Sequence, residues 1–103
     1  MGLAFIADVL SGVQSGAIGT AQARQTFART FGVMCWEFLD NRQKDALTAG
    51  SDAILHRLAA RQIDYDTACR QITVLVEAAV KRDYRLFDFM CSKVNAARDV
   101  TVN

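Results

Sequence analysis

His56 is the only histidine of the chain and lies four residues after Asp52, a spacing that places both side chains on one face of a helix. Such a pair could act in acid–base catalysis or supply two metal ligands, but either chemistry needs further groups. The sequence has no second histidine and no closely spaced cysteine pair to complete a site. We therefore predict an ordinary surface pair, with no metal, no cofactor and no catalytic residue.

The three cysteines, Cys35, Cys69 and Cys91, are odd in number, far apart, and form no C-x-x-C motif. A secreted disulfide framework uses an even and denser set. All three fall on apolar stripes, whereas a nucleophilic thiol needs an exposed, electropositive setting. Glu37 falls on the polar side of its helix. We expect reduced cysteines packed in the core, a cytoplasmic, reducing compartment, and a protein that is not an enzyme.

The composition is that of one helical domain spanning residues 1–103, with 51% hydrophobic residues, 22% charged residues and no proline. Apolar residues recur at helical spacing and alternating patterns are absent. The expected helices cover 2–14, 20–41, 43–61 and 65–98. We predict an all-α fold, a small helical bundle of about four helices built as two αα-hairpins with a long C-terminal helix. A break at Gly50-Ser51 would divide the third helix.

The last expected helix would be about 50 Å long, which is too long for so small a domain. It therefore either bends near 81–83 or projects and packs on another chain. The longest strongly apolar run, residues 33–39, contains Glu37 and is too short to span a bilayer. No membrane insertion is expected.

The segment Ile63–Ile72 resembles the turn and recognition helix of helix-turn-helix proteins. The resemblance implies a degenerate motif around residues 56–72, in which Thr67, Arg70 and Gln71 would read DNA bases. A DNA-binding regulator is therefore the alternative function.

Several observations weigh against this alternative. Arg61 stands where the motif has an apolar residue, and Gln62 stands where glycine is common. An N-cap at Asp64 and an ion pair between Asp66 and Arg70 would explain the same residues without DNA. The net charge of +1 also lacks the basic excess of nucleic-acid binders.

Large apolar residues that lie outside the helical stripes indicate a contact surface. A helix that is apolar nearly all round is either central or contacted by a partner, and tryptophan and arginine dominate binding hot spots. The interface candidates are Arg29, Val33, Trp36, Arg82, Arg85 and Phe89. Alternatively, Trp36 packs under the N-terminal helix. We predict a non-catalytic protein–protein interaction module (a small adaptor, a regulator or inhibitor, or a chaperone-like protein) that self-associates, as a homodimer first.

Overall fold

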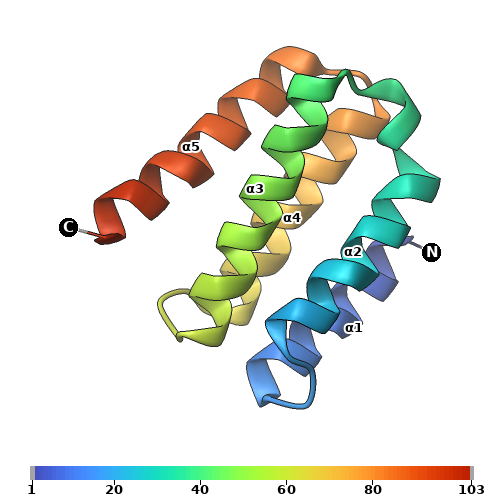
Figure 1. Ribbon diagram of the computed structural model, residues 1–103. Helices are drawn as coiled ribbons and strands as arrows, with labels where there is room; N and C mark the ends of the chain where they lie inside the picture. Colours follow the sequence, from blue (N-terminus) through green and yellow to red (C-terminus); the bar gives the residue numbers. More distant parts are fainter. Residues whose placement is uncertain (1, 103) are drawn as a thin grey trace.

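The computed structural model describes the backbone of residues 2–102 and the side chains of residues 5–95 (Figure 1). Its elements are α1 (Gly2–Ser15), α2 (Thr20–Met34), the 3-10 helix η1 (Trp36–Phe38), α3 (Asn41–Ala59), α4 (Tyr65–Val80) and α5 (Tyr84–Val102). Residues 2–102 contain no strand, which confirms the predicted all-α class. Within that range no helix combines the length and the apolar character needed to cross a membrane.

The helices are arranged as two antiparallel hairpins and one additional helix. α1 pairs with α2, and α3 pairs with α4, while α5 packs against both α3 and α4 and then runs away from them toward the C-terminus (Figure 1). All five α-helices contribute fully buried side chains to one core, among them Leu10, Phe27, Leu55, Ile72 and Phe87. Burial of this apolar surface is the main force that holds the helices together.

α2 ends at Met34, earlier than the expected end near residue 41. The chain then forms η1, and α3 begins after a capping box at Asp40. The Asp40 carboxylate accepts a hydrogen bond of 2.8 Å from the Gln43 N–H, and the Gln43 side chain accepts one of 3.0 Å from the Asp40 N–H. These reciprocal bonds satisfy two free donors and start a new helix in a new direction.

The segment expected as one helix over 65–98 is two helices, so the long C-terminal helix is not continuous, and the alternative of a bend near 81–83 is the one that the structure shows. α4 ends at Val80 and α5 begins at Tyr84, so the chain bends at 81–83. Arg82 adopts a left-handed backbone with φ 60°, and the Asp83 carboxylate accepts a hydrogen bond of 3.3 Å from the Leu86 N–H. α3, in contrast, continues without a break through Gly50 and Ser51.

The loops of the two hairpins place matching residues 45 positions apart. Ile18 and Ile63 are both partly buried against the core, and each is followed by an N-cap residue, Gly19 or Asp64. One turn into the next helix, Ala23 and Ala68 are both fully buried. In each loop one isoleucine therefore packs between the helices that the loop joins.

Candidate binding surfaces on α4 and α5

α5 buries one side and presents apolar side chains on the opposite side. Phe87, Cys91 and Val94 are buried in the core. Because a helix turns by about 100° per residue, Phe89 points away from these three side chains. Phe89 is 60% exposed, and Leu86 beside it is 40% exposed. Large apolar side chains that no described residue covers are candidates for contact with a partner.

Two cations border these apolar side chains. Arg85 is exposed one turn before Phe89, and the Lys93 ammonium lies 5.9 Å from the centre of the Phe89 ring. Neither cation forms an ion pair with another described side chain. The surface made by Arg85, Leu86, Phe89 and Lys93, which we call the α5 face, is therefore apolar at its centre and basic at its edges.

Arg82 belongs to the turn that precedes this face and is held against η1. Its guanidinium carbon lies 4.4 Å from the centre of the Phe38 ring, which is a cation–π geometry. The Tyr84 hydroxyl donates a hydrogen bond of 2.7 Å to the Phe38 carbonyl oxygen. These two contacts fix the start of α5 relative to the end of the first hairpin.

The remaining interface candidates lie elsewhere. Arg29 and Val33 are exposed on the outer side of α2, where Val33 is 89% exposed. Trp36 is partly buried against the core, between α2 and α3, and the Lys44 ammonium lies 5.7 Å from its ring centre. The structure therefore gathers Arg85 and Phe89 on one face and places Trp36 in a different environment.

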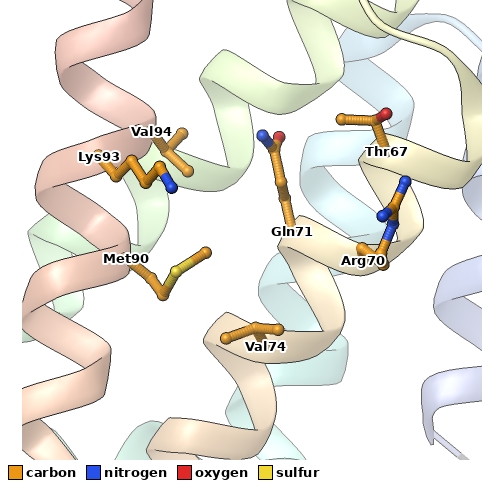
Figure 2. Close-up of a pocket in the computed structure, with 7 residues that line it drawn as sticks. All are labelled: Thr67, Arg70, Gln71, Val74, Met90, Lys93 and Val94. Carbon is orange, nitrogen blue, oxygen red and sulfur yellow. The ribbon is translucent and has the colours of Figure 1, made fainter.

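α4 and α5 are separated by a groove of about 380 Å³, drawn in Figure 2. Seven residues line it, four from α4 and three from α5: Thr67, Arg70, Gln71, Val74, Met90, Lys93 and Val94. The polar side chains gather toward the start of α4, and Val74 and Met90 lie toward the opposite end of the groove (Figure 2). We call this feature the α4–α5 groove; sequence reasoning singled out three of its residues, Thr67, Arg70 and Gln71, but did not predict a groove.

The three residues proposed as DNA readers all line this groove. Thr67 and Gln71 are partly buried, and only Arg70 is exposed. In helix-turn-helix proteins the two helices meet at about 90–120°. α3 and α4 instead lie antiparallel and side by side (Figure 1). DNA binding stays an untested alternative, and this geometry does not favour it.

The start of α4 is capped as the sequence indicated. The Asp64 carboxylate accepts a hydrogen bond of 2.8 Å from the Thr67 N–H. Hydrogen bonding from the Thr67 side chain and from this N–H holds the pKa of Asp64 below its usual value. The expected ion pair between Asp66 and Arg70 does not form, so the Arg70 guanidinium has no ion-pair partner among the side chains that the structure describes.

Asp52 and His56 are neighbours on α3, and the structure adds Arg24 from α2. The Arg24 guanidinium lies 2.8 Å from the Asp52 Oδ1 atom, and the His56 Nδ1 atom lies 3.4 Å from the same Oδ1. Nδ1 also lies 2.9 Å from the Asp52 carbonyl oxygen. In the described part of the chain no three His, Cys, Asp or Glu residues lie close enough to hold a metal ion. The cluster is therefore an ion pair that joins two helices at the surface.

Cys35 and Cys91 are buried, and Cys69 is partly buried. All three thiols are free. Burial raises the pKa of Cys35 and of Cys91 to about 11, because the thiolate loses its contact with water. A thiol with so high a pKa is a poor nucleophile near neutral pH. These two residues therefore serve as small apolar side chains.

Comparisons with family models, with curated proteins and with solved structures found no match for this chain.

Proposed function

We propose that the chain is a non-catalytic protein-interaction module, and that it binds an acidic, amphipathic helix of a partner protein across the α5 face. The exposure of Phe89 at the centre of this face carries the proposal, because an aromatic ring that is 60% exposed is a typical anchor of a binding surface. Leu86 adds apolar area beside it. A helical partner would place its own apolar residues against these two side chains.

The charges of the face favour an acidic partner. Arg85 and Lys93 flank Phe89, and neither has an ion-pair partner among the described side chains. Carboxylates placed on both sides of the partner's apolar residues would meet these cations. Complementary charges speed association and fix the register of the two surfaces.

Self-association, which the sequence predicts, would fit this face less well. Arg85 and Lys93 lie four residues before and four residues after Phe89. In an antiparallel pair of α5 helices centred on Phe89, Arg85 of each copy would therefore face Lys93 of the other. This arrangement brings like charges together, which costs free energy. A homodimer is thus an outcome that the experiments must separate from the proposed complex.

The proposal is tested with two designed helical peptides that share one apolar stripe. In the first peptide glutamates flank the stripe, and in the second lysines replace them. We expect saturable binding of the glutamate peptide by fluorescence anisotropy, weaker at higher salt, and much weaker binding of the lysine peptide. Phe89→Ala should reduce the affinity for the glutamate peptide about tenfold or more.

Val33→Ala is the matched control, because Val33 is also an exposed apolar residue but lies on α2. It should leave peptide binding unchanged, and circular dichroism should show full helicity in both variants. Equal affinities for the two peptides, or no effect of Phe89→Ala, would contradict the proposal. Light scattering measures the self-association separately: a dimer that Phe89→Ala dissociates would assign the α5 face to a second copy of the chain instead.

A further inference from the structure

We propose that the α4–α5 groove is a second binding site, which shares only Lys93 with the α5 face, and that its ligand is a small amphipathic acid. The ligand would carry a carboxylate, an N–H or O–H donor next to it, and a short apolar side chain. The proposal rests on the groove's lining residues and does not depend on the proposed partner of the α5 face. The volume of about 380 Å³ is near the lower end of the range of roughly 300–1,000 Å³ for small-molecule sites.

The polar end of the groove is suited to a carboxylate. Arg70 on α4 and Lys93 on α5 border the groove from its two sides (Figure 2). Neither residue forms an ion pair with any side chain in the described range 5–95. Two cations without a carboxylate partner at one end of a groove attract an anionic group.

Gln71 indicates that the ligand also donates a hydrogen bond. Its amide points into the space between the two helices (Figure 2). The Gln71 Oε1 atom is buried and accepts no hydrogen bond from any residue that the structure describes. Buried polar atoms of this kind are nearly always paired in folded proteins. Gln71 itself is only partly buried, so a rotation of its amide would turn this atom toward the groove, where an N–H or O–H group next to the ligand's carboxylate would supply the missing donor.

The opposite end of the groove is apolar. Val74 and Met90 face each other there across the two helices, and Val94 lines the groove beside Lys93 (Figure 2). Methionine is unbranched and adapts its shape to an apolar group. A short branched side chain on the ligand would bury its surface between Val74 and Met90. The order of polar and apolar groups along the groove thus sets the orientation of the ligand.

The test is an NMR titration of the full chain with N-acetyl-leucine, which has the carboxylate, the N–H donor and the branched side chain. We expect saturable shifts of backbone amides in residues 67–74 and 90–94. N-acetyl-leucinamide lacks the charge, and N-acetylglycine lacks the side chain, so both should bind much more weakly. Arg70→Gln should weaken the binding of N-acetyl-leucine about threefold to tenfold, the effect of losing one exposed charged contact.

Two further variants keep the result interpretable. Val74→Phe fills the apolar end without changing any charge and should abolish the shifts. Arg29→Gln removes an exposed arginine from α2 and should leave the affinity unchanged. The proposal is overturned if the shifts do not saturate, if they spread over the whole chain, or if the neutral amide binds as well as the acid. Because Arg70 lies outside the α5 face, Arg70→Gln should not change binding of the glutamate peptide.

Discussion

Gly16 and Arg61 stand 45 residues apart and occupy the same position in the two helical hairpins. Both have a left-handed backbone, with φ 85° for Gly16 and 60° for Arg61. Each backbone N–H donates to the carbonyl oxygen three residues earlier, Gly16 to Val13 and Arg61 to Leu58. Glycine adopts this conformation at no steric cost, whereas the Cβ of arginine crowds the backbone. The second hairpin therefore carries a local strain that the first avoids.

Arg61→Gly should stabilise the protein. Removing the Cβ relieves this strain, and the greater freedom of glycine in the unfolded chain offsets part of the gain. We expect the free energy of unfolding to rise by about 0.5–1 kcal/mol. Urea denaturation with an unchanged m-value measures it.

Two comparisons control for this substitution. Arg61→Ala keeps the Cβ and should give no gain. Arg82→Gly changes a residue with the same φ of 60° but removes the contact with Phe38, so its gain should be smaller. A loss of stability in Arg61→Gly would contradict our account of the turn.

Truncating Leu55 and truncating Leu86 should have very different effects. Leu55 is fully buried, so Leu55→Ala leaves a cavity and should lower the free energy of unfolding by about 2–5 kcal/mol. Leu86 is 40% exposed on the α5 face, so Leu86→Ala should change the free energy of unfolding by about 0.5 kcal/mol or less. Thermal unfolding of both variants measures the contrast. A large loss in Leu86→Ala would show that the α5 face is needed for folding.

The cap at Asp64 should make stability depend on pH at acidic values. The Thr67 hydrogen bonds lower the pKa of Asp64 from the ordinary value of 3.8, so the folded state prefers the charged carboxylate. This stabilisation is fully present above pH 3.8 and is lost as the pH falls through the lowered pKa. Asp64→Ala should therefore lower the melting temperature at pH 7, and its difference from the wild type should shrink below pH 3.8. A constant difference at all pH values would contradict this account.

The three thiols should differ in reactivity toward iodoacetamide at pH 8. Cys35 and Cys91 are buried and have a pKa of about 11. At pH 8 only a small fraction of each thiol is therefore present as the reactive thiolate. Cys69 is partly buried and should be alkylated first. Mass spectrometry of native protein should show one fast modification, and unfolding in urea should expose all three thiols. Rapid modification of Cys35 in the native protein would show that the core opens readily.

Helical spacing in the sequence predicted the helical class and the places of most helices, because a buried stripe leaves a clear periodic pattern. The same spacing predicted too late an end for α2, because Cys35 and Phe38 continue the apolar stripe beyond Met34. The competing signal was present as Asp40 and Gln43, which form a capping box three residues apart. Local hydrogen bonds decided where α2 ended and α3 began.

The candidate surfaces were harder to predict. Phe89 lies opposite the buried side of a regular helix, so the helical pattern placed its side chain outside the core, where it is 60% exposed. Trp36 belongs to η1, and the pattern of α2 no longer describes its direction. The α4–α5 groove depends on how two helices separate after the turn at 81–83. That separation is a property of tertiary packing, which no spacing in the sequence records.

Both candidate surfaces include residues of α5, which packs against α3 and α4. Because α5 lies outside the two hairpins, we expect it to open locally while the hairpins stay paired, and its amide hydrogens to exchange with solvent faster than those of the central helices. A ligand in the α4–α5 groove or on the α5 face would bind only the folded, packed form of α5. Occupancy of either surface would then appear as slower amide exchange along this one helix, even where the ligand touches none of the protected amides.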